Sequence, residues 1–490
     1  MLTLSTPLLA PQLVATLWPS LSLPDVRLAA RLEQSVEHLL TRWDGPSGLR
    51  GRTAQRGWTR FCNNPRVDTT TLFRAATDQT IRAIANVKVL VLAHDTSEID
   101  KHGRAEPDDA GPLRSAHSRG YLLHGCTAID LATGARLGVL DAMAWTRSWK
   151  LRKKDHGTRA PHKKESIKWR RGLRRADAIL RAVPSLQVVF HAMDREGDVH
   201  ENFAYALRHK VTVVARAEHD RRVQGAHAKL FAHLEAQPCV ESWDAVVPNR
   251  VNAKARKAAA AEGERALARF DARVRTLGAV RTATLELRFA PVTLTPDPEK
   301  HRTRRPLALW AVLAREVDAP AEVDALEWML LTTYRVEDAH AAKLVVHAYL
   351  CRWGCEDLHK LIKTGLHLES DPVEGIASFR RQLAVVLPVA THLMQWSWVA
   401  REMPGVPAAA HVPSELLEAA RDASVIAKLP VTRRPRTVRE FVVRLAELGG
   451  YERGRGTFPG WLTIWRGWKH LQAFREILAF AEKRRRKTPS

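Results

Sequence analysis

The sequence predicts an α/β fold that carries a large antiparallel insertion and has helical regions at both ends. Two apolar segments rich in β-forming residues, 87–94 and 186–193, are each followed directly by an aspartate. Alternation with a period of two, typical of strands with one buried face, recurs between 217 and 333. A chain of 490 residues is long enough to form more than one domain.

The first predicted region, residues 1–85, mixes helical patterns with basic residues. Helical spacing places Arg27 and Arg31 one turn apart, so that both could contact a phosphate backbone. Taken alone, ordinary surface charge explains these two arginines equally well.

The second region, 86–365, is the predicted α/β core. Its first strand ends at Asp95, and the strand 186–193 ends at Asp194. Strands over 120–131 and 135–145 form a hairpin through a short Ala-Thr-Gly turn. An acid at the end of a buried strand is exposed at the sheet edge while its backbone stays rigid. The alternative for such an aspartate is a turn or a helix cap.

An antiparallel β subdomain is predicted as an insertion over 217–333. Its expected elements are strands around 269–275, 282–289, 307–314 and 327–333, with an exposed Ala-rich loop or helix over 254–268. A helix from 336 to 364 follows, with a break near Trp353-Gly354.

One narrow face of that helix is predicted to carry an unusual set of side chains. A helix rotates by about 100° per residue, and this rotation brings four residues to the same face: Tyr349, Arg352, Glu356 and Lys363. Apolar residues should fill the buried face of a structural helix, so a carboxylate between an aromatic ring and two cations suits a metal-binding acid beside a phosphate backbone. The alternative is a solvated face with ordinary helical ion pairs.

Residues 366–490 are predicted to be largely helical. The longest uncharged run, 383–400, contains proline and several polar residues, which favours a buried core helix over a membrane span.

The net charge of +24 points to a polyanionic partner, most simply nucleic acid. An anionic membrane is a weaker alternative, because the sequence has neither a compact basic amphipathic helix nor a lipidation motif. Five scattered cysteines suit a reducing compartment, and the N-terminus lacks the pattern of a secretory signal. We therefore expect a cytoplasmic protein.

Asp95, Asp194 and Glu356 are three acids far apart in the sequence. Carboxylates of this kind can hold two Mg²⁺ or Mn²⁺ ions, which would activate a water or a 3′-hydroxyl at a phosphodiester. His and Cys recur every fourth residue over 347–359, but they spread along some 18 Å of helix and cannot converge on one zinc ion.

The spacing Tyr-x2-Arg-x3-Glu-x6-Lys, met by residues 349–363, resembles the signature of bacterial DDE insertion-sequence transposases. Asp95-Thr-Ser and Asp194-Arg-Glu-Gly-Asp resemble the family motifs around the first and second acids. The resemblance implies a ribonuclease-H-like catalytic core over 86–365. It also implies a transposon-end-binding domain over 1–85 and a dimerisation region over 366–490.

The resemblance further implies a Mg²⁺-dependent enzyme, with two ions per active site and Mn²⁺ as a substitute. Such an enzyme binds double-stranded transposon ends, cuts them by hydrolysis and hairpin formation, and joins the 3′ ends to target DNA. It acts as a homodimer in a synaptic complex on DNA in the bacterial nucleoid, without a membrane partner. By matching position, the DNA-contacting residues are Arg27, Arg31, Arg216, Trp328, Tyr349, Arg352 and Lys363.

Two positions need separate comment. The resemblance implies that Trp328 stacks on a flipped base, whereas its apolar strand alone favours a core residue. Gly354 departs from the family pattern and should weaken a helix by roughly 1 kcal/mol. Two other functions remain open, namely a metal-dependent nuclease without strand transfer and a catalytically inert DNA-binding repressor.

Overall fold

The computed structural model describes residues 10–41, 49–103, 106–115, 117–148, 164–181, 183–278, 280–296, 305–453 and 458–485. It divides into two compact units. Unit 1 comprises Met1–Lys164, Gly172–Gln187 and Trp353–Ser490, and unit 2 comprises Glu165–Arg171 and Val188–Arg352. Both units contain helices and strands, so the predicted α/β class is confirmed. The three functional regions remain a prediction, which compactness does not test.

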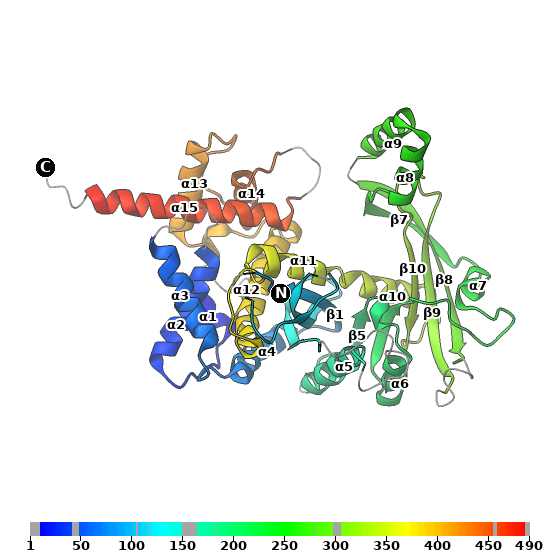
Figure 1. Cartoon of the computed structure of the whole chain (residues 1–490). Coiled ribbons are helices and arrows are strands. Elements are labelled where there is room, and N and C mark those ends of the chain that lie inside the picture. Colours follow the sequence, from blue (N-terminus) through cyan, green and yellow to red (C-terminus); the bar gives the residue numbers. More distant parts are fainter. Residues whose placement is uncertain are drawn as a thin grey trace. The chain divides into compact units, whose positions relative to one another are not determined.

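The strands of unit 1 are antiparallel (Figure 1). They are β1 (Val89–Asp100), β2 (Gly111–Pro112), β3 (Arg119–Asp130) and β4 (Arg136–Trp145). Strand β3 pairs with β1 along one edge and with β2 and β4 along the other. The predicted hairpin of β3 and β4 is confirmed, and Gly134 in its turn has a φ of 68°, which favours glycine.

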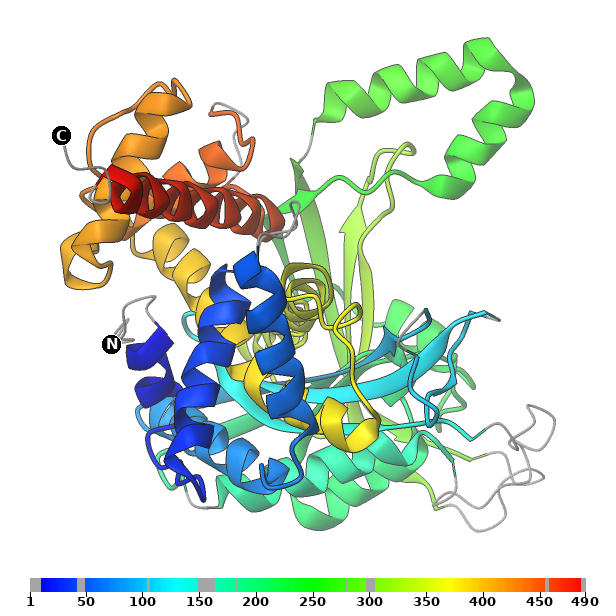
Figure 2. The ribbon, with the colours of Figure 1, turned by 60° about the vertical axis from the view of Figure 1, so that its left-hand side comes forward.

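Helices cover these strands and build the N- and C-terminal parts of unit 1. The N-terminal helices are α1 (Ala10–Leu17), α2 (Val26–Thr41), α3 (Leu49–Asn63) and α4 (Thr69–Ile84). The C-terminal helices are α12 (Ile376–Glu402), α13 (Ser414–Ile426), α14 (Val438–Leu448) and α15 (Trp461–Arg485). Helices α2 and α3 run side by side (Figure 2). Helix α4 packs closely on β4, where a Cβ at Gly138 would lie 2.1 Å from Thr80 Oγ1.

Helix α12 forms the core of the C-terminal half of unit 1. Its length and hydropathy would suffice to cross a membrane, but 83% of its most apolar window is buried inside the protein. The prediction of a buried core helix over 383–400 is therefore confirmed. Asp109 caps its first turn by accepting a hydrogen bond from Ile376 N at 2.8 Å.

The strands of unit 2 form a mixed sheet. In spatial order they are β5 (Val188–Met193), β6 (Thr212–Arg216), β10 (Glu327–Thr332), β9 (Leu307–Val317), β8 (Val280–Leu294) and β7 (Glu241–Pro248). Strands β5 and β6 are parallel, and every later pair is antiparallel. The antiparallel strands predicted near 282–289, 307–314 and 327–333 are thus confirmed.

The helices of unit 2 are α6 (His200–His209), α7 (Leu230–Glu235), α8 (Ala253–Glu262), α9 (Glu264–Leu277) and α10 (Ala339–Cys351). Helix α5 (Ile167–Leu180) contributes its first residues to unit 2 and the rest to unit 1. The strand predicted around 269–275 is wrong, because this segment belongs to α9. The residues shielded there, Leu267, Phe270, Val274 and Leu277, follow helical spacing rather than alternation.

The segment that follows α10 is not one uninterrupted helix. Helix α10 ends at Cys351, Arg352 and Trp353 form a turn, and α11 runs from Gly354 to Lys360. A π-helical turn, Leu361–Gly365, then closes the segment. The predicted break at Trp353-Gly354 is confirmed. The single face predicted for Tyr349 to Lys363 is not, because it assumed regular α-helical rotation throughout.

Candidate active site

Asp95 lies within strand β1 rather than at its end. The strand continues to Asp100 because its polar half stays paired with β3, with Asp95 opposite Gly125. The predicted strand-end position of Asp95 is therefore wrong. A Cβ at Gly125 would meet no atom within 4 Å, so no side chain fills the space opposite the Asp95 carboxylate. Asp95 thus projects from the face of the sheet, where its side chain is 14% exposed.

Helix α11 lies against this part of β1. The Cys355 Sγ is 3.4 Å from the carbonyl oxygen of Ala93, two residues before Asp95 on the same strand face. His359 Nδ1 is 3.3 Å from Asp95 Oδ2. Glu356 precedes His359 by three residues, so both point from the same side of α11. Unit 1 therefore brings the helix acid Glu356 to the side of α11 that contacts Asp95.

Gly354 allows α11 to approach the sheet closely. A Cβ at this position would lie 2.9 Å from Arg136 Nε and 3.3 Å from Ile129 Cδ1. Arg136 also pairs with Asp357 of α11 at 3.1 Å. The glycine weakens the helix locally, but it lets the helix lie on β3 and β4 where a larger residue would collide.

Lys363 follows on the π turn. Its Nζ is 3.7 Å from Glu369 Oε1, and the side chain is partly exposed. Helix α15 holds the turn, because the Trp465 indole donates to the carbonyl oxygen of Gly365 at 2.8 Å. Lys363 is therefore positioned by the C-terminal helix as well as by its own segment.

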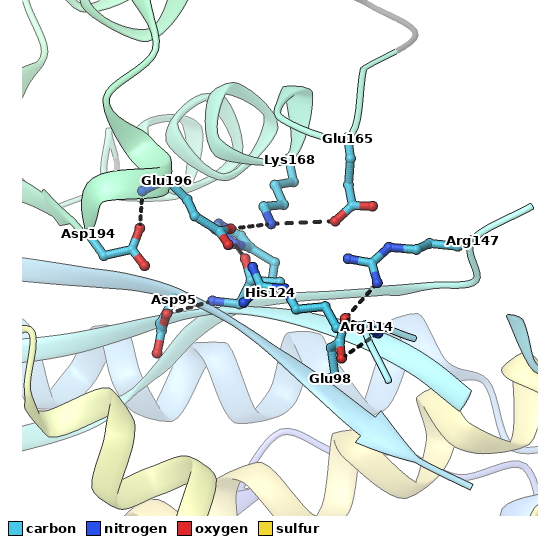
Figure 3. A network of polar contacts seen from close by, with 10 residues as sticks. Asp95, Glu98, Arg114, His124, Arg147, Glu165, Lys168, Asp194 and Glu196 are labelled. Carbon is cyan, nitrogen blue, oxygen red and sulfur yellow. Dashed lines mark hydrogen bonds and ion pairs between the residues drawn. The ribbon is translucent and has the colours of Figure 1, made fainter. Parts of the chain in front are cut away.

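The opposite face of β1 is buried and carries histidines. His94 and His124 stack with ring centroids 5.6 Å apart, and Thr96 Oγ1 is 2.9 Å from His124 Nδ1. Burial lowers the pKa of His94 to about 3, so this ring is neutral at physiological pH. Further along this face, Glu98 pairs with Arg147 at 2.6 Å (Figure 3).

Asp194 lies in unit 2, directly after β5, as predicted. Its carboxylate accepts a hydrogen bond from Glu196 N at 2.9 Å and caps a short 3₁₀ turn, Arg195–Gly197 (Figure 3). Gly197 is required there, since a Cβ would lie 2.4 Å from Met193 Cβ. The helix-cap alternative for Asp194 is thus also observed, and the side chain remains half-buried.

Lys168 holds two acids together, one in this loop and one just before α5. Its Nζ is 3.0 Å from Glu196 Oε2 and 3.7 Å from Glu165 Oε1 (Figure 3). Asp198, the third acid of the same loop, is buried against Arg221 at 2.7 Å. Asp198 therefore fixes the loop, while Asp194 keeps an accessible carboxylate.

Three of the predicted DNA contacts cluster in unit 2. Arg216 donates to the carbonyl oxygen of Glu327 at 2.7 Å, and it also interacts with Tyr349. Burial lowers the pKa of Arg216 from its ordinary value, while Tyr349 and Glu327 act in the opposite direction. The Arg352 guanidinium lies 5.8 Å from the Tyr349 ring centroid. Tyr349 is 2% and Arg352 7% exposed, so the solvated-face alternative is wrong for both.

Trp328 is a strand residue in β10, opposite Ala314 of β9, and is 6% exposed. A base cannot stack on it unless the surrounding side chains move. In unit 1, Arg27 is exposed on α2, and Arg31 lies one turn further, with its Nη1 2.8 Å from the position of a Cβ on Gly57. Their predicted one-turn spacing is confirmed.

Sequence reasoning missed the contact of His359 with Asp95 and the role of Lys168. The spacing Glu356-x2-His359 is a signal for the former, because residues three apart share a helix face. No sequence signal connects Lys168 with Glu196.

The donor chemistry of Asp95 and Glu356 suits a hard divalent cation. Within the described residue ranges, no group of three or more His, Cys, Asp or Glu side chains is arranged to hold a metal ion. The third predicted ligand, Asp194, belongs to unit 2. Two carboxylates of the right type are therefore present in unit 1, without an assembled three-ligand group.

The fold and these contacts describe a strongly basic, mixed α/β protein in which an acid on a sheet face contacts a short helix that carries a second acid. No model of a known protein family matches this chain.

Proposed function

We propose that this protein is a DDE transposase with a ribonuclease-H-like core, which cuts transposon ends and joins them to target DNA. The observation that carries the proposal is the position of α11 on β1, with His359 of that helix 3.3 Å from Asp95. The net charge of +24 supports a DNA substrate. The spacing of Tyr349, Arg352, Glu356 and Lys363 supports this particular class of enzyme.

In the proposed mechanism, Asp95, Asp194 and Glu356 would hold two Mg²⁺ ions. Bound Mg²⁺ would lower the pKa of an attacking water or 3′-hydroxyl and stabilise the leaving oxygen. His359 would orient the Asp95 carboxylate by hydrogen bonding to it, and Lys363 would bind a neighbouring phosphate.

A homodimer is the second part of the proposal. The outer turns of α15 expose Ile477 and Phe480 at 66% and 65%. Large apolar side chains exposed close together on one helix are typical of an interaction surface. A second copy of the chain would cover them in a synaptic complex.

The experiment that tests the proposal incubates the full chain with Mg²⁺ and two labelled DNA segments that flank its own gene. A transposase joins the labelled 3′ ends to an added plasmid. A metal-dependent nuclease yields cut ends without joined products, and a DNA-binding repressor only shifts the mobility of the DNA. Either of the last two results would contradict the proposal.

A further inference from the structure

Helices α8 and α9 form a hairpin arm that projects from the ends of β7 and β8 (Figures 1 and 2). No residue of α8 is buried, and Phe270 is the only buried residue of α9. The arm therefore adds almost nothing to the hydrophobic core of unit 2. Its surface side chains are free of packing constraints.

The arm nevertheless has a fixed base. Asn249, which follows β7, donates to the carbonyl oxygens of Leu277 and Gly278, both at 2.9 Å. Asn252 caps α8 by accepting from Lys254 N and Ala255 N at 3.1 Å. Arg256 of α8 pairs with Asp271 of α9 at 3.0 Å. The two helices are thus held to each other and to the end of the hairpin.

Positive charge dominates the arm. Its cations, all exposed, are Lys254, Arg256, Lys257, Arg265, Arg269, Arg273 and Arg275, against the acids Glu262, Glu264 and Asp271. The cations Lys257, Arg265 and Arg269 form no ion pair with any residue that the structure describes.

These three cations point away from the contact between the two helices. Helical spacing places Arg265 and Arg269 one turn apart on α9, opposite the stripe that contains Phe270. Lys257 lies on α8 opposite the partly shielded Ala255 and Ala259. Each helix therefore presents positive charge on its outer face, where it serves neither core packing nor ion pairing.

We infer that the α8–α9 arm is a second DNA-binding surface, which contacts the phosphate backbone of duplex DNA outside the cleavage point. Exposed Lys and Arg on a rigid support match the charge of a polyanionic duplex, and phosphate contacts of this kind carry no sequence information. The inference rests on the proposed function, since it assumes that DNA is the substrate.

The test measures the affinity of the full chain for a 40-bp duplex of arbitrary sequence between 50 and 200 mM NaCl. The arm variant combines Lys257→Ala, Arg265→Ala and Arg269→Ala, which keep good helix formers at exposed positions. The control variant removes three exposed helical charges outside the arm and outside residues 1–85, by Arg208→Ala, Arg401→Ala and Arg421→Ala. Both variants lose the same net charge.

We expect the arm variant to lose about 2.7 units of the slope of log affinity against log salt concentration, roughly 0.9 for each phosphate contact. Wild-type affinity should then fall about 40-fold more than that of the arm variant over this salt range. The control variant should keep the wild-type slope. An unchanged slope in the arm variant, or an equal change in both variants, overturns the inference about the arm. Failure of the wild-type protein to bind any duplex instead overturns the proposed function.

Discussion

Replacing Trp465 by phenylalanine tests whether α15 holds the π turn that carries Lys363. The Trp465 indole donates to the carbonyl oxygen of Gly365 at 2.8 Å, and the side chain is 4% exposed. Phenylalanine keeps an aromatic ring but cannot donate, and a buried carbonyl left without its partner costs about 1–3 kcal/mol. Because the lost bond ends on the turn, we expect this cost to lower the free energy of opening residues 361–365 locally.

Amide hydrogen exchange of the full chain measures that opening directly. Leu366 N donates to the carbonyl oxygen of Leu361 at 2.8 Å, and Leu368 N to that of Ile362 at 3.0 Å. Both amides are protected only while the turn is closed, so their exchange should accelerate about 5- to 150-fold in Trp465→Phe. If the proposed function holds, cleavage of pre-bound DNA should also slow by roughly 10- to 100-fold, because Lys363 loses its fixed position.

Trp468→Phe is the matched control. Trp468 lies on the same helix, is also 4% exposed, and donates to the carbonyl oxygen of Leu40 on α2 at 2.6 Å. The control loses the same kind of bond, but its exchange should accelerate near the end of α2. Equal acceleration of 361–368 in both variants, or none in Trp465→Phe, would refute a specific role of Trp465 at the turn.

Each of the variants Asp95→Asn, Asp194→Asn and Glu356→Gln should lose Mg²⁺-dependent cleavage but still bind end DNA in a mobility-shift assay. If one of them still cuts DNA, the residue that it replaces is not a metal ligand. Trp328→Ala should cost about 3–5 kcal/mol in a denaturant titration because Trp328 is buried. It should also leave the first nick intact and slow hairpin closure on a pre-nicked end, whereas unaltered closure makes Trp328 purely structural. Burial lowers the pKa of His94 to about 3, so the unfolded chain binds the extra proton first as pH falls from 6.5 towards 3. Between pH 6.5 and 3, the free energy of unfolding of the wild type should therefore fall more than that of His94→Phe, by at most roughly 5 kcal/mol. Parallel curves of unfolding free energy against pH for the two proteins would contradict this.

Local sequence patterns predicted the strands whose pairing partners are close in the sequence. The β3–β4 hairpin was predicted because two alternating segments flank a Gly-containing turn, and the chemistry of that turn is local. The end of β1 was predicted wrongly because it depends on pairing with another strand and not on local sequence. Residues 95–98 are polar and resemble a loop, yet they remain in the strand because β3, some 25 residues later, offers them a partner.

The candidate site was predicted in part for similar reasons. Asp95 and Asp194 could be selected from the sequence because each directly follows an apolar segment. Glu356 could be selected because of its spacing within the segment 349–363. The contact between His359 and Asp95 depends on how α11 docks on β1, which spacing within α11 does not determine. The π turn was missed because one extra residue in a helical turn leaves the hydrophobic pattern almost unchanged.

The α8–α9 arm leaves and re-enters unit 2 at neighbouring points, since Pro248 at the end of β7 pairs with Val280 at the start of β8. A two-residue turn could join these strands without disturbing the sheet. The length of the arm can therefore change without altering the pairing of β7 with β8. Under the proposed function, replacing residues 251–277 with a small sequence-specific DNA-binding element would offer a way to choose the DNA that this protein engages, with the acids of both units left in their native sequence context.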